Sequence, residues 1–171
     1  LNFETRLMCA TSDTSYITRG DLKDAIKSLF ADQSDIALLY YAGHGSYDSL
    51  GGYLCTSEVS RSDDGLSLND IMGIVSNSPA KNKIVILDSC HSGLIASSNE
   101  MQNYSILHKG TTILAACDEN QYSSEENGHG VFTTLMIEAL YGGGMNLLGD
   151  VSPGSVYSYI DSCLSFWEQR P

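Results

Sequence analysis

The hydrophobic positions of this chain form two kinds of pattern. Three runs are almost continuously apolar: Asp35–Ala42, Lys83–Asp88 and Thr111–Ala116. Strands that are covered on both faces show such continuous runs, as in a parallel sheet. We therefore predict three buried strands at these positions. A shorter apolar run at Thr5–Ala10 predicts a further strand.

Between and after these runs, apolar residues recur with the spacing of amphipathic helices. Capping residues precede several of these stripes, at Thr18–Asp21, Ser67–Asp70 and Ser152-Pro153, which predicts where the helices begin. The helical stripes cover Leu22–Phe30, Leu68–Val75, Phe132–Leu140 and Val156–Trp167, and a polar, turn-rich stretch leaves room for a small hairpin around Gly52–Thr56. Strands that alternate with helices predict an α/β fold in three layers, with a mostly parallel sheet flanked by helices.

Composition narrows the choice of partners. The 171 residues are enough for one domain with a hydrophobic core, and 42% of them are hydrophobic. The net charge is −12 with only 9 Lys and Arg, so we expect no nucleic-acid partner. No apolar run approaches the roughly 20 residues that cross a bilayer, so we expect no membrane partner.

The cysteines and the chain ends bear on cellular context. No C-x-x-C pair occurs among Cys9, Cys55, Cys90, Cys117 and Cys163. Widely spaced cysteines in odd number favour reduced thiols and a cytoplasmic location, with most of them as small apolar fillers. The chain starts without Met and stops directly after a helical pattern. We therefore expect an excerpt of a larger protein, with other domains of that protein as partners.

Reactive residues follow two of the predicted strands. The first strand leads into Gly43-His44-Gly45, and the second leads into Asp88-Ser89-Cys90-His91-Ser92-Gly93. Ligands of parallel sheets gather at the carboxyl ends of the strands, so neighbouring strands would bring His44 and Cys90 together. Alone, each residue is more often structural, but the pair beside glycines favours a thiolate nucleophile with an imidazole partner. No G-x-S-x-G elbow supports a serine nucleophile.

Asp88 precedes Cys90 by two residues, so both side chains lie on one face if the strand continues. Two interpretations of this carboxylate remain open. It can form the floor of a pocket that binds a Lys or Arg side chain of a substrate. Equally, it can be a structural carboxylate that accepts hydrogen bonds from neighbouring backbone N–H groups.

The stretches "LLYYAGHGSYD" and "IVILDSCHSG" resemble the caspase-like cysteine peptidases, and more specifically their metacaspase and bacterial caspase-like branch. Cys90 follows His44 by 46 residues (90 − 44), close to the roughly 50 of caspases. "TTILAACDENQYSSEE" and "GHGVFTTLMIEAL" resemble the small subunit. The resemblance implies one peptidase domain: 1–94 is large-subunit-like, 95–110 is a mobile or cleavable loop or an ordinary connection, and 111–171 is small-subunit-like. The first strand of that fold is missing from this chain.

The resemblance also implies roles for individual residues. His44 would be the general base and acid, and Cys90 the nucleophile. Backbone N–H groups of Gly45 and Cys90 would form the oxyanion hole. Asp88 would line the primary specificity pocket, with Asp118 as a secondary candidate, which implies cleavage of peptides or proteins after Arg or Lys.

Some features of the family are absent. The pentapeptide of animal caspases does not occur, so cleavage after Asp is not expected. Asp63 and Asp64 are thin support for a calcium site, so we expect no cofactor and no metal. The leading hypothesis is the endopeptidase effector domain of a larger bacterial signalling or defence protein. The alternative is a catalytically latent interaction module; a metal site at His44 and Cys90 would lack ligands. The oligomeric state is left open.

Overall fold

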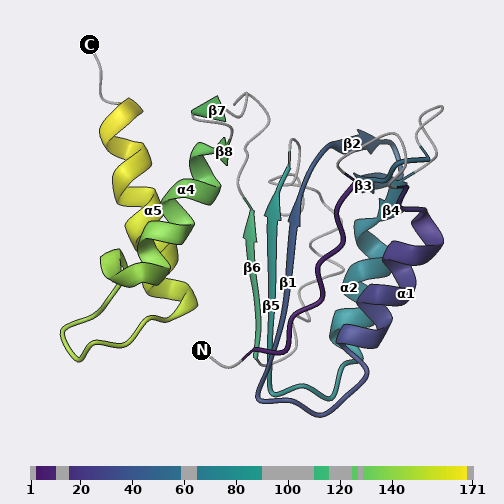
Figure 1. Cartoon of the computed structure of the whole chain (residues 1–171), viewed down its shortest axis with the longest axis horizontal. Helices are drawn as coiled ribbons and strands as arrows, with labels where there is room; N and C mark the ends of the chain where they lie inside the picture. The colour runs from purple at the N-terminus through teal and green to yellow at the C-terminus, as the bar shows by residue number, and fades with distance from the viewer. Residues whose placement is uncertain are drawn as a thin grey trace.

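The computed structural model describes residues 3–10, 16–58, 65–89, 110–115, 125–126 and 129–168. In the described part of the chain, α1 and α2 each precede a group of strands, and three helical elements follow the last strand (Figure 1). In chain order the elements are α1 (Arg19–Leu29), β1 (Ile36–Ala42), β2 (Gly45–Asp48), β3 (Gly51–Cys55), β4 (Gly65–Ser67), α2 (Leu68–Ser76), β5 (Asn82–Asp88), β6 (Thr111–Ala115), β7 (Glu125–Glu126), β8 (His129–Gly130), α4 (Val131–Glu138), the π-helix η2 (Ala139–Gly143) and α5 (Pro153–Glu168).

The central sheet consists of the three strands that the continuous apolar runs predict. Its order is β1-β5-β6, and both neighbouring pairs are parallel. Val85 and Leu87 in the middle strand are 1% and 0% exposed. A strand that is covered on both faces needs apolar residues at every position rather than at alternate ones. The three strand predictions and the parallel sheet are therefore confirmed.

Helices cover both faces of this sheet (Figure 1). One core cluster packs α1 and α2 against one face; its buried members include Ile26, Phe30, Ile71, Val75, Val85 and Leu87. A second cluster packs α4, η2 and α5 against the other face; its buried members are Ile86, Leu114, Met136, Ala139, Val156 and Ile160. Successive residues of β5 thus point alternately into the two clusters. This arrangement confirms the predicted three-layer α/β fold.

The helix starts follow the predicted caps. Thr18 and Asp21 form a reciprocal capping box at α1, in which the Thr18 side chain accepts from the Asp21 backbone and the Asp21 side chain accepts from the Thr18 backbone. The Ser67 side chain accepts from the Asn69 N–H at the start of α2. At α5, Ser152 Oγ accepts from the Ser155 N–H at 3.2 Å. These contacts satisfy N–H groups that have no partner within the helix.

A small antiparallel sheet, β2-β3-β4, follows directly after His44. It contains the hairpin that the turn-rich stretch predicts, with Gly45 opposite Leu54. Leu54 and Leu66 are each 1% exposed and belong to the same cluster as α1 and α2. Leu54 and Leu66 therefore anchor this sheet to the core. Because Gly45 pairs with Leu54, the start of β2 next to His44 is held in place as well.

The strand prediction for Thr5–Ala10 is wrong. Residues 3–10 have no regular secondary structure, and Leu7 is 86% exposed. A short apolar run becomes a strand only when a neighbouring strand supplies hydrogen bonds and covers its side chains. Within the described residues, no strand pairs with this segment.

No helix in the described ranges has the length and hydropathy needed to cross a membrane.

Candidate active site

The candidate active site lies at the edge of the sheet where β1 and β5 end side by side, called the catalytic edge because His44 and Cys90 are predicted to act there. Ala42 lies opposite Asp88 as the last pair of the ladder. Beyond it, the Gly43 N–H donates to the Asp88 carbonyl at 3.1 Å. The chain segments that lead to His44 and to Cys90 therefore leave the sheet next to each other. The two strands are thus neighbours, which is the condition for the predicted approach of His44 and Cys90 at one edge.

Cys90 lies outside the described residues, as do Asp118 and the proposed loop at 95–109. Their predicted roles, including the N–H of Cys90 in an oxyanion hole, stay predictions. The same holds for Asp63 and Asp64. Among the described residues, no group of three or more His, Cys, Asp or Glu side chains is arranged to hold a metal ion.

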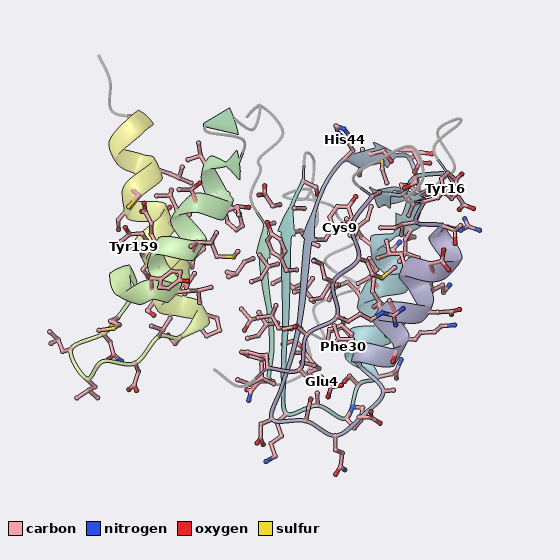
Figure 2. All side chains as sticks on the ribbon, in the orientation of Figure 1. Glu4, Cys9, Tyr16, Phe30, His44 and Tyr159 are labelled. Carbon is pink, nitrogen blue, oxygen red and sulfur yellow. The ribbon has the colours of Figure 1, made fainter. Side chains whose placement is uncertain are left out.

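Hydrogen bonds fix the backbone of His44. Its carbonyl accepts from the Cys55 N–H at 2.9 Å and from the Tyr41 hydroxyl at 2.8 Å. The same hydroxyl lies 2.7 Å from the Cys55 carbonyl and shares its single hydrogen between the two acceptors. Tyr41 thus links the backbone of His44 to Cys55, the last residue of β3. His44 itself is exposed and lies beyond the end of β1 (Figure 2).

Two further features support this arrangement of Tyr41. A Cβ atom on Gly43 would lie 2.8 Å from the Tyr41 hydroxyl oxygen, so only glycine lets the ring fold back at this point. Burial raises the pKa of Tyr41 well above its ordinary value, and the neighbouring Cys55 adds to this shift. The hydroxyl therefore stays protonated and keeps its hydrogen for the two carbonyls.

Asp88 is half-buried, and its carboxylate accepts a hydrogen bond from the side chain of Thr133 in α4. The Tyr40 hydroxyl lies 2.6 Å from the same Thr133 oxygen. The donor to this carboxylate is thus a side-chain hydroxyl, where one of the two sequence-based interpretations expected backbone N–H groups. Ser89, the next residue, is 5% exposed, which agrees with the view that it is not a nucleophile.

Sequence reasoning missed Tyr40, Tyr41 and Thr133. Tyr40 and Tyr41 read as part of an apolar strand, and Thr133 reads as a polar position in a helix. The only sequence signal was the tyrosine pair directly before Gly43-His44, since a tyrosine hydroxyl that is buried usually finds a partner. The partners Thr133, Asp88 and Cys55 lie on other elements, which no local pattern shows.

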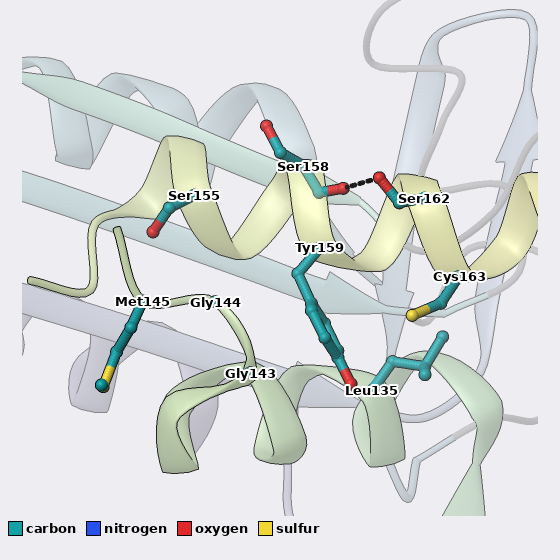
Figure 3. A pocket seen from close by; sticks show the side chains of 9 residues that line it. All are labelled: Leu135, Gly143, Gly144, Met145, Ser155, Ser158, Tyr159, Ser162 and Cys163. Carbon is teal, nitrogen blue, oxygen red and sulfur yellow. Dashed lines mark hydrogen bonds between the residues drawn. The ribbon is translucent and has the colours of Figure 1, made fainter. Parts of the chain in front are cut away.

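An open groove lies elsewhere, between α4, η2 and α5 (Figure 3). Its lining includes Leu135, Met145, Tyr159 and Cys163, and none of its residues belongs to β1 or β5. Tyr159 donates to the Glu138 carboxylate at 3.1 Å. The groove is therefore separate in the sequence and in the fold from the strand ends that carry the predicted dyad.

Comparison with protein families places the chain in a known class. The family model of the caspase domain, a peptidase family, matches residues 1–152. The chain belongs to this caspase-domain family, and its fold is the one that the resemblance implied. Membership supports a cysteine-type peptidase with protein substrates. A search of curated proteins returns no match to the chain.

Proposed function

We propose that the protein is a cysteine endopeptidase that uses Cys90 as nucleophile and His44 as its acid–base partner. The observation that carries this proposal is the parallel pairing of β1 and β5, whose last pair is Ala42 and Asp88. Each strand is followed two residues later by one member of the dyad. Carboxyl ends of neighbouring parallel strands are where α/β proteins place reacting groups.

The chemistry follows from the two groups. The Cys90 thiolate attacks the carbonyl carbon of the substrate, and His44 gives a proton to the amine as the C–N bond breaks. Water then loses a proton to His44 and attacks the thioester, which releases the carboxylic acid and restores the thiol. N–H groups of Gly45 and Cys90 would stabilise the negative oxygen that develops in each step.

Asp88 is proposed to select substrates with Arg or Lys before the scissile bond, with Asp118 as a second acidic group. A carboxylate at the sheet edge attracts a cationic side chain and can hydrogen-bond to it. The half-buried position of Asp88 reduces the screening of its charge by water. The chain in which the domain acts is proposed to be a larger bacterial signalling or defence protein.

A panel of fluorogenic peptides tests the proposal, with Arg, Lys, Asp or Leu before the scissile bond and with or without calcium. We expect the Arg and Lys peptides to be cleaved fastest. Cys90→Ala should reduce cleavage at least about a thousandfold, because no other group replaces the nucleophile. Cys9→Ala, which removes an exposed thiol, is the matched control and should leave the rate unchanged.

Alkylation gives a second measurement on the same protein. An activated Cys90 should react with iodoacetamide faster than the other cysteines, Cys9, Cys55, Cys117 and Cys163, as followed by mass spectrometry of the peptides. Equal alkylation rates together with no cleavage of any peptide would contradict the proposal. That result would favour an interaction module that lacks activity.

A further inference from the structure

Three polar side chains from three elements form a continuous chain of contacts beside the catalytic edge. The Tyr40 hydroxyl of β1 lies 2.6 Å from Thr133 Oγ1 of α4. Thr133 Oγ1 in turn donates to Asp88 Oδ2 of β5. Thr133 therefore lies between the two strands of the catalytic edge and contacts a side chain from each of them.

The sheet register explains why these residues meet. Tyr40 lies opposite Ile86, two residues before Asp88, so Tyr40 and Asp88 point to the same face of the sheet. Ile86 belongs to the cluster that packs this face against α4, and Phe132 packs against the same cluster. The position after Phe132 is Thr133, which the packing of the helix brings over the end of β5.

The direction of the hydrogen bonds follows from the number of hydrogens. A hydroxyl has one hydrogen, and an ionised carboxylate can only accept. Because Thr133 gives its hydrogen to Asp88, the hydrogen between Tyr40 and Thr133 must come from Tyr40. Burial raises the pKa of Tyr40, the hydrogen bond with Thr133 lowers it in part, and the charge of Asp88 raises it again. Tyr40 therefore remains a donor at neutral pH.

We propose that Thr133 is a positioning residue for substrate specificity, and that Tyr40 orients it, so that Asp88 is held as a fixed acceptor for a cationic side chain. The inference rests on the proposed function and deepens it. Thr133 donates to one oxygen of the carboxylate, Oδ2. In this proposal the other oxygen, Oδ1, accepts from the guanidinium or ammonium group of the substrate. A carboxylate that is already oriented loses less freedom when the substrate binds.

The test compares two peptides that differ only in charge. One has arginine before the scissile bond, and the other has citrulline, which is the neutral analogue of nearly the same shape. We expect Thr133→Val to raise KM for the arginine peptide about tenfold with little change in kcat, because a hydrogen bond to a charged group is lost. The citrulline peptide should show no such change.

Three variants separate positioning from folding. Thr133→Ser keeps the hydroxyl and should restore KM to within about twofold of the original value. Tyr40→Phe should raise KM for the arginine peptide by a smaller factor, about threefold, because it acts through Thr133. Thr134→Val makes the same chemical change at the exposed neighbouring position, about 100° around the helix, and should leave KM unchanged.

A binding measurement makes the inference independent of activity. Calorimetry of the Cys90→Ala protein with a tetrapeptide amide that ends in arginine, or in citrulline, should show the same dependence on Thr133. If both peptides lose affinity equally in Thr133→Val, or if Thr133→Ser fails to restore the difference, the inference is overturned. Arginine preference that depends on Thr133 in a protein without any cleavage would overturn the proposed function alone. Cleavage without arginine preference would overturn the role of Asp88 and of Thr133.

Discussion

At the scale of single residues, Tyr40 and Tyr41 place two hydroxyl groups on opposite faces of β1. Tyr40 contacts Thr133 and through it Asp88, on the face that α4 covers. Tyr41 bonds to the carbonyls of His44 and Cys55, on the side of the small antiparallel sheet. Alternation along a strand sends neighbours in opposite directions. One dipeptide thus supports both the proposed acid–base residue and the proposed specificity residue.

The role of Tyr41 leads to a prediction about turnover. We expect Tyr41→Phe to lower kcat about tenfold with little change in KM, because the hydrogen bond that holds the His44 backbone is lost while the substrate pocket is untouched. Steady-state kinetics with an arginine peptide measure both constants. Tyr47→Phe is the matched control, since Tyr47 in β2 is 50% exposed. Unchanged kcat in Tyr41→Phe would show that the carbonyl bond does not position His44.

The residues of the site differ in how far the sequence predicts them. His44 and Asp88 were predicted because each follows or ends a buried strand, and strand ends in parallel sheets are local features. Thr133 was not predicted, because its importance depends on a contact with a side chain 93 residues away. The positions of Cys90 and Asp118 stay predictions. Local pattern therefore finds groups with their own chemistry and misses the groups that orient them.

At the scale of elements, the sequence predicts those strands and helices whose burial repeats regularly. The runs at β1, β5 and β6 are apolar without interruption because helices cover them on both sides. The run at Thr5–Ala10 is also apolar in its centre, yet Leu7 remains exposed and no strand is formed. Composition alone does not show whether a partner strand is present. The cap residues, by contrast, act within one turn and were predicted in place.

Two glycines allow a matched test of whether the close backbone contact just before β6 affects stability. Gly110 and Gly149 have nearly the same backbone angle, with φ of +85° and +86°. A Cβ atom on Gly110 would lie 2.2 Å from the Lys81 carbonyl oxygen, whereas one on Gly149 would meet nothing within 4 Å. Gly149→Ala should therefore cost only the left-handed backbone conformation, about 1–2 kcal/mol in the free energy of unfolding.

Gly110→Ala should cost more, about 3 kcal/mol or above, because backbone atoms must also move apart. That movement would disturb the bond from the Lys83 N–H to the Gly110 carbonyl, which is 2.7 Å long and begins the pairing of β5 with β6. Urea denaturation of both variants measures the difference. Equal losses of stability would mean that the close approach to Lys81 has no energetic consequence.

At the scale of the whole molecule, the packed layers that stabilise the sheet are distinct from the edge that carries the proposed site residues. Each face of the sheet is packed by its own cluster of buried residues, so the sheet is held in place from both sides. Asp88 at the end of β5 is half-buried, and His44, two residues after β1, is exposed at the edge of these layers. An edge that rigid layers hold can keep reacting groups in register without burying them.

The overall charge leads to a last prediction, which rests on the proposed preference for basic side chains. A net charge of −12 creates a negative potential that attracts a cationic peptide before it reaches the site. We expect kcat/KM for the arginine peptide to fall about threefold or more between about 50 mM and about 500 mM NaCl, since salt shortens the range of this attraction. The citrulline peptide should change little over the same range.

The variant Asp88→Asn distinguishes the effect of the charge at the site from the effect of the net charge of the whole protein. It should lower kcat/KM for the arginine peptide at every salt concentration, because the contact at the site is lost. The salt dependence should remain, because it arises from the 21 Asp and Glu residues together rather than from one of them. A salt dependence that disappears with Asp88 would locate the attraction at the site. An equal salt effect on both peptides would show that salt acts on the protein and not on the approach of the substrate.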